Sequence, residues 1–170
     1  MNPYLFESEL IRLRQTQAEE VEVVLAWEQH PDHVPFVGQW TREQHLRSLT
    51  DEDLLHLVVE DTASGQAVGY LLLAGLLHPH RSLEFRRIVI ARKGSGFGRA
   101  ALQAVKQLAF ERYHAHRLWL DVREPNRRAY HLYRSEGFVE EGTLRECIRV
   151  HDGTYESLIV MSILRREYES

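Results

Sequence analysis

The sequence predicts an α+β fold, of the kind also classed as α/β, in which a mixed and mostly antiparallel sheet has helices on both faces. A central parallel strand pair is indicated because residues 83–90 read as a buried strand, 97–112 as an amphipathic helix and 118–122 as a second buried strand. A strand, a helix and a strand in this order form a right-handed βαβ crossover. Short apolar runs on both sides of this unit predict antiparallel hairpins.

The N-terminal part predicts a short strand followed by two helices. Residues 10–13 alternate in polarity as a strand does. Thr16 and Glu19 have the spacing of a capping box, which predicts a helix running to about Trp27. The same signal recurs at 41–44 and predicts a second short helix.

The middle of the chain predicts a hairpin beside the central strand. Residues 54–60 and 67–75 read as strands, and the Gly and Ser of 62–66 suit a tight reversal between them. Residues 88–90 are apolar on both faces of their strand. Their strand therefore belongs at a central position that is covered on two sides.

The C-terminal part predicts one more helix and a hairpin. A helix over 126–136 ends at Gly137, where a left-handed residue closes the last turn. The last part of the sheet begins at Phe138. Strands over 144–150 and 155–164 flank an Asp-Gly turn, which is a strong hairpin signal.

Composition limits the classes of function. The 170 residues, 44% of them hydrophobic, suit one globular domain spanning 1–170. With 21 Lys and Arg against 25 Asp and Glu, the chain has no basic surplus for nucleic acid. A single cysteine, Cys147, forms no internal disulfide, and no apolar run reaches the length of a membrane span. We therefore expect a cytoplasmic protein without a nucleic-acid or membrane partner.

The glycine-rich segment 92–99 lies between the first parallel strand and its helix. Glycines there let successive N–H groups converge on one anion at a helix N-terminus, and Lys93 and Arg99 add positive charge. The segment lacks the third glycine of a dinucleotide fingerprint and the Gly-Lys-Ser/Thr end of a Walker loop. It indicates a pyrophosphate site of another kind, and the alternative is a simple chain reversal.

The helix over 126–136 adds a second clue. Asn126, Ala129, Tyr130 and Tyr133 share one of its faces, and it starts just beyond the carboxyl end of strand 118–122, where α/β sheets bind ligands. Asn126 and Tyr133 can therefore reach one site. The alternative interpretation of Tyr133 is a half-buried core phenol whose hydroxyl is hydrogen-bonded.

The two segments together resemble the GNAT superfamily of acyl-coenzyme A-dependent N-acetyltransferases, most closely its RimJ/RimL-like branch. The family loop R/Q-x-x-G-x-G/A matches 93–98, with lysine in the first place. The family's Asn, Ala, Leu-Tyr and Gly-Phe signature matches 126–138. The likeness extends from 12–14 to 161–164 and implies a GNAT-like fold with a central parallel pair.

The resemblance implies acetyl-CoA as acyl donor and direct transfer to an amine in a ternary complex. The pantetheine arm is expected to pair with strand backbone and the pyrophosphate to lie on loop amides, with the Val89 N–H facing the reacting carbonyl. Tyr133 matches the family tyrosine that protonates the departing thiolate. The implied cofactor contacts are Ile88, Val89, Ile90, Lys93, Gly94, Ser95, Gly96, Phe97, Gly98, Arg99 and Asn126.

Glu84, near the start of strand 83–90, is the candidate base for the amine proton, and a solvated edge charge is the alternative. A covalent route through Cys147 is disfavoured, and we expect that thiol to be buried and structural. The histidine pairs at 78–80 and 114–116 lack carboxylate or cysteine neighbours at metal-binding spacing, so no metal is expected.

The acceptor is predicted from the free energy needed to deprotonate its amine. At pH 7 the neutral form costs about 1.2 kcal/mol for an α-amine and about 4.6 kcal/mol for a lysine-like amine. A protein or peptide N-terminal amine is therefore the leading prediction. The alternatives are a small-molecule amine (a metabolite, polyamine or antibiotic), favoured by a narrow acidic pocket, and a non-catalytic acyl-CoA sensor. The oligomeric state stays open, with a homodimer among the options.

The acceptor pocket is expected to include aromatic residues from the N-terminal helices, their connecting segment and the last hairpin, although core packing explains them nearly as well. These residues are Trp27, Phe36, Trp40 and Tyr155.

Overall fold

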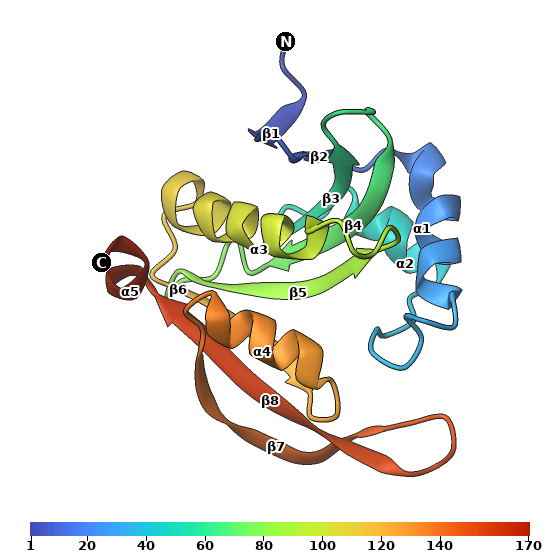
Figure 1. Ribbon diagram of the computed structural model, residues 1–170, viewed down its shortest axis with the longest axis vertical. Coiled ribbons are helices and arrows are strands. Elements are labelled where there is room, and N and C mark those ends of the chain that lie inside the picture. The colour runs from blue at the N-terminus through green and yellow to red at the C-terminus, as the bar shows by residue number, and fades with distance from the viewer.

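A computed structural model describes all residues, Met1–Ser170. One sheet of eight strands runs in the order β1-β2-β3-β4-β5-β6-β8-β7 (Figure 1). The strands are β1 (Tyr4–Glu7), β2 (Ile11–Gln15), β3 (Leu54–Asp61), β4 (Ala67–Ala74), β5 (Ser82–Ile90), β6 (Arg117–Arg123), β7 (Val139–Arg149) and β8 (Tyr155–Leu164). The helices are α1 (Val21–Gln29), α2 (Arg42–Ser48), α3 (Phe97–Gln107), α4 (Arg127–Ser135) and α5 (Arg165–Glu169).

The sheet confirms the predicted fold class. Every neighbouring pair is antiparallel except β5 and β6, which are parallel and joined through α3. Alternate side chains of β4 point to different layers: Leu71 and Leu73 pack in the core that contains α3, whereas Tyr70 and Leu72 pack with Val24 of α1. Because successive strand residues face opposite sides, helices cover both faces of the sheet.

The parallel pair separates soon after it forms. Only 82–84 of β5 are in register with 117–119 of β6. Against β4 the register of β5 shifts between Phe85 and Arg87, so that Arg86 is an extra residue on the β5 side. A bulge of this kind bends a strand and ends local pairing. The edge of β5 that faces β6 is therefore unpaired beyond Glu84.

The first capping prediction is wrong by one residue. The backbone N–H of Gln17 donates to Glu20 Oε1 at 2.8 Å, and a short 3-10 turn, Ala18–Glu20, precedes α1. The Thr16 hydroxyl instead lies 2.7 Å from Nδ1 of the buried His56, because a buried hydroxyl needs a partner that the helix end does not supply. The second capping box, at the start of α2, is confirmed.

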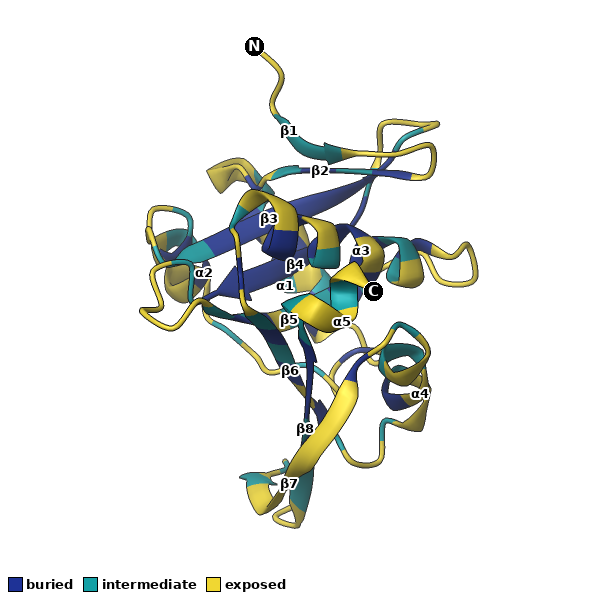
Figure 2. Ribbon diagram, turned by 90° about the vertical axis from the view of Figure 1, so that its left-hand side faces the viewer, coloured by how far each residue is buried: buried dark blue, intermediate teal, exposed yellow.

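The ends of the chain differ from the prediction. β1 and α5 were not expected, and β7 is one strand of eleven residues with register shifts that begins at Val139, five residues before the strand predicted over 144–150. After α3 the helix continues as a π-helical turn, Leu108–Arg112. Cys147 is exposed, which corrects the expected buried thiol: β7 is the outermost strand and almost all of its residues face solvent (Figure 2). No helix has both the length and the apolar character needed to cross a membrane.

Candidate active site

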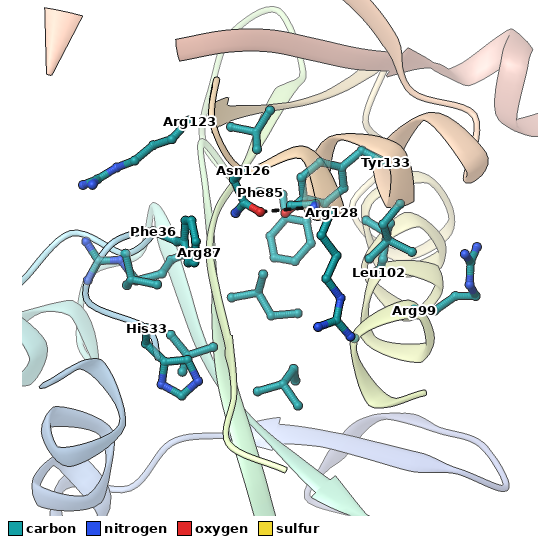
Figure 3. Close-up of a pocket in the computed structure, with 18 of the residues that line it drawn as sticks. His33, Phe36, Phe85, Arg87, Arg99, Leu102, Arg123, Asn126, Arg128 and Tyr133 are labelled. Carbon is teal, nitrogen blue, oxygen red and sulfur yellow. Dashed lines mark hydrogen bonds between the residues drawn. The ribbon is translucent and has the colours of Figure 1, made fainter. Parts of the chain in front are cut away.

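A cavity of about 1030 Å³ lies where β5 and β6 separate. Figure 3 shows its lining, with α3 and α4 on one side of β5 and the segment between α1 and α2 on the other. The structure brings nearly all of the predicted site residues to its wall: Glu84, Ile88, Val89, Ile90, Lys93, Gly94, Gly96, Phe97, Gly98, Arg99, Asn126 and Tyr133. Ser95 of the predicted set lies outside this lining.

The glycine segment leaves its amides open to a ligand. Gly94 and Gly96 have φ of +80° and +78°, in the left-handed region that favours glycine. Gly96 is the N-cap of α3 and offers no side chain to the N–H groups of the first turn. A Cβ placed at Gly94 or Gly98 would meet no atom within 4 Å. The loop therefore has both the free donors and the space that a pyrophosphate requires.

The basic side chains around this loop differ in availability. Arg99 is turned toward α4, where Nη1 donates to Glu136 at 2.5 Å and to Ser135 at 3.0 Å. Lys93 Nζ lies 4.0 Å from Asp32 on the other rim. Arg128 of α4 extends into the cavity without a carboxylate partner (Figure 3). Arg128, which the sequence analysis did not single out, is thus the more accessible cation for a phosphate.

The open edge of β5 forms the floor between the loop and the strand bulge. Ile88 and Ile90 pack against the α3 core, and Val89 faces the α1 side. Because β6 has diverged, the backbone groups that β5 presents on this edge have no strand partner. An extended ligand containing amides can complete the pairing as an added strand, so the floor suits a pantetheine arm.

Tyr133 and Asn126 enter the cavity from α4. The Asn126 side chain accepts a hydrogen bond from the Ala129 N–H at 3.3 Å and so also caps the helix (Figure 3). The Tyr133 ring packs beside Phe138, with centroids 6.0 Å apart, and its hydroxyl has no hydrogen-bond partner in the chain. Burial, and secondly the charge of Asp121, raises the pKa of Tyr133 to about 12. The phenol is therefore protonated at neutral pH and free to donate.

Two carboxylates face each other across the start of the opening. Glu84 of β5 accepts from the Arg86 guanidinium at 2.9 Å, and Asp121 of β6 lies two residues beyond the partner of Glu84 in the parallel ladder. Burial and the nearby charge of Glu84 raise the pKa of Asp121 above its ordinary value. The sequence reasoning missed Asp121, although alternation in β6 places 119, 121 and 123 on one face, opposite the buried 118, 120 and 122.

The segment between α1 and α2 supplies the opposite wall. His33 donates from Nδ1 to the Trp27 carbonyl at 2.6 Å, and its buried Nε2 has no partner in the protein. Phe36 also lines the cavity, as expected, whereas Trp27, Trp40 and Tyr155 do not. Arg123 of β6 donates to the Pro35 carbonyl at 2.7 Å and ties this segment across the opening.

Three features together define the class of coenzyme A-dependent acyltransferases. They are a mixed sheet that opens between two parallel strands, a loop of free amides at one end of the opening, and a phenol at the other end. The chain belongs to the acetyltransferase (GNAT) family, whose profile matches residues 16–138. Transfer of an acetyl group from acetyl-CoA to an amine is the activity of this enzyme.

Related proteins agree on this assignment. Spermidine N(1)-acetyltransferase of Vibrio cholerae is 33% identical over 127 residues, covering 74% of this chain and 72% of the relative. The Escherichia coli K12 enzyme of the same name is 25% identical over 93% of this chain and 88% of its own. The crystal structure of the V. cholerae enzyme in complex with CoA and spermine superposes with a TM-score of 0.85 at 26% identity, covering 96% of this chain and 100% of that one.

These relatives support the superfamily but give no support to the RimJ/RimL-like branch predicted from the sequence. Both signature segments line the predicted acyl-donor side of the cavity, so they do not identify the acceptor.

Proposed function

We propose that the protein acetylates a primary amine of a small polyamine, and that Glu84 and Asp121 recognise its positive charge. The observation that carries this proposal is the pair of carboxylates at the mouth of the strand opening, where burial and the charge of Glu84 disfavour the ionised form of Asp121. A polycation placed between them relieves that repulsion. The relatives named for spermidine, one of them crystallised with spermine, point to the same acceptor class.

The wall opposite α3 also favours a small acceptor over a protein N-terminus. The segment between α1 and α2 is tied to β6 through the Arg123 contact with Pro35, so this segment closes one side of the opening. Together with the two carboxylates, this wall fits a small amine better than a peptide.

The chemistry assigned to the chain's own groups is direct transfer. As the amine nitrogen bonds to the acetyl carbonyl carbon, a backbone N–H on the open edge of β5 donates to the carbonyl oxygen, where negative charge collects. The expected donor, the Val89 N–H, points the other way, because Val89 pairs with Tyr70 of β4. The carbon–sulfur bond breaks, and Tyr133 gives its proton to the sulfur. The proton lost by the amine passes to Glu84 or Asp121, directly or through water. An amine of lysine-like basicity needs about 4.6 kcal/mol to lose its proton at pH 7, so two carboxylates at the entrance serve both binding and proton acceptance.

The test is an acceptor panel of spermidine, spermine, a monoamine, free lysine and a peptide with a free N-terminus, scored by thiol release and product mass. Spermidine or spermine should give the highest kcat/KM. Glu84→Gln and Asp121→Asn should each raise the spermidine KM about tenfold, since a charged hydrogen bond contributes about 1.5 kcal/mol or more. Glu9→Gln, which removes an exposed carboxylate outside the cavity lining, should leave it unchanged.

Two results would overturn the proposal. A peptide N-terminus with a higher kcat/KM than every polyamine would restore the first prediction. Binding of acetyl-CoA without turnover on any amine would make the protein a sensor.

For the assembly we expect more than a dimer. A V. cholerae relative forms a dodecamer in a structure that matches this chain with a TM-score of 0.79. Sedimentation velocity at micromolar concentration measures the assembly directly.

A further inference from the structure

Behind the acceptor wall, a chain of buried side chains runs from β2 to the cavity. Thr16 Oγ1 lies 2.7 Å from His56 Nδ1, and His56 Nε2 lies 3.1 Å from His45 Nδ1. His45 Nε2 lies 2.9 Å from Glu28 Oε1, and Arg87 Nη1 donates to Glu28 Oε2 at 2.6 Å. Glu28 and His45 are fully buried.

The proton on each nitrogen follows from these contacts. Glu28 is an acceptor and balances the charge of Arg87, so His45 donates from Nε2 and must accept at Nδ1. His56 therefore donates from Nε2 and accepts the Thr16 proton at Nδ1. Burial, and secondly the charge of His45, lowers the pKa of His56 to about 3, so His56 is neutral in this arrangement. Each ring nitrogen of the two histidines and both carboxylate oxygens of Glu28 have a partner, so Glu28 has one orientation.

Glu28 has a third donor in the Tyr70 hydroxyl. Three donors from three different elements meet on two carboxylate oxygens. Its hydrogen bonds lower the pKa of Glu28 despite burial, so the group is ionised over the working pH range. An amide in its place removes the charge that balances Arg87, and with its NH₂ toward His45 it requires the protons on both histidines to reverse.

Arg87 connects this chain to the cavity. Its side chain is only 11% exposed, and its carbon Cζ lies 4.9 Å from the ring centroid of Trp40. A Cβ built on Gly38 would lie 3.0 Å from Nη2, so the guanidinium packs directly against the backbone of the acceptor-side segment. Figure 3 places Arg87 with Phe36 and His33, on the side of β5 opposite α3.

We propose that Glu28 is a positioning residue for the acceptor: oriented by His45 and His56, it holds the Arg87 guanidinium beneath residues 36–40 and thereby fixes the wall against which the amine docks. Neither Glu28 nor the histidines reach the cavity lining, so they act through Arg87. The acyl-donor side, with the glycine loop and the β5 edge, does not depend on them. Loss of Glu28 should therefore weaken amine binding selectively.

The chain contains a matched control in Glu60 of β3. It is also buried and accepts from a tyrosine and two arginines, namely Tyr4, Arg12 and Arg14, but it lies away from the cavity. Glu28→Gln and Glu60→Gln thus remove equivalent charged networks. Only the first should change how the acceptor binds.

The experiment compares wild type, Glu28→Gln and Glu60→Gln with the best amine of the acceptor panel. For Glu28→Gln we expect the amine KM to rise at least tenfold, with kcat within threefold and the acetyl-CoA Kd, measured by calorimetry, within twofold of wild type. Glu60→Gln should lower the melting temperature without moving the amine KM. Equal amine KM values in all three proteins, or equal increases in both variants, would overturn the positioning role.

Two milder variants keep the inference testable if Glu28→Gln does not fold. Arg87→Lys keeps the charge but loses the planar contact with Trp40, and Gly38→Ala places a methyl 3.0 Å from Nη2. Both should raise the amine KM about threefold or more at unchanged acetyl-CoA affinity, and no change in either would overturn the proposal. The inference rests on the proposed function only for the choice of amine. An inactive wild type contradicts the proposed function. An active wild type whose amine KM is unchanged in the variants contradicts the role of Glu28.

Discussion

Replacement of Tyr133 by phenylalanine tests the assigned acid directly. The variant removes one oxygen from a half-buried ring that packs against Phe138, so the fold should be retained. What it removes is the hydroxyl proposed to protonate the departing sulfur. Negative charge develops on that atom only as the carbon–sulfur bond breaks, so the loss should fall on kcat and not on acetyl-CoA affinity.

The magnitude follows from the environment of the phenol. With a pKa of about 12, Tyr133 carries its proton in all but a negligible fraction of molecules at pH 8. A hydrogen bond to a charged partner contributes about 1.5–3 kcal/mol, which corresponds to roughly 10- to 150-fold in rate. We therefore expect kcat to fall by about one to two orders of magnitude, with the acetyl-CoA Kd within twofold.

Single-turnover acetylation measures this effect without interference from product release. Tyr113→Phe is the matched control, because Tyr113 packs against the core outside the cavity. In wild type, no alkaline loss of rate from Tyr133 should appear below about pH 10, because the raised pKa keeps the acid protonated. A Tyr133→Phe rate within twofold of wild type would refute the assignment.

Three further predictions concern the loop, the phosphate cation and the buried histidine. Gly96→Glu should reduce acetyl-CoA affinity more than tenfold in calorimetry, because its φ of +78° strains any other residue and the new charge repels phosphate; unchanged affinity would make the loop a plain turn. Arg128→Ala should weaken acetyl-CoA binding severalfold and flatten its salt dependence, and an unaltered salt slope would remove Arg128 from the site. Because the folded-state pKa of His56 is about 3 against about 6.5 unfolded, the unfolded chain takes up a proton first as pH falls; stability should be constant above pH 6.5 and lower by about 2 kcal/mol at pH 5. Urea unfolding at pH 7 and 5 measures this, and His56→Gln should remove most of the difference.

Sequence reasoning reached the acyl-donor site because its parts are local. The glycines of 94–98 and the helix face with Asn126 and Tyr133 each lie within one short segment, and the order of strand, helix and strand places both at one edge of the sheet. The same reasoning misplaced the first capping box by one residue, since the partner of Thr16 is 40 residues away on β3.

Local sequence patterns could not predict the residues on the acceptor side of the cavity. Asp121 is significant only because Glu84 faces it, and that follows from the register of the parallel pair. The ion pair of Glu28 with Arg87 joins residues 59 positions apart. Patterns within a short segment of sequence do not predict which distant side chains will be in contact.

The amino-acid sequence by itself therefore determined the family fold, the location of the donor loop and the protonated phenol, because periodicity, turn chemistry and helix-end electrostatics act over a few residues. Only the tertiary structure decided where the sheet opens, which carboxylates flank the opening and what holds the opposite wall. Those features arise from a strand bulge, from register and from buried hydrogen bonds between elements, and their energies exist only once distant segments have excluded water from between them.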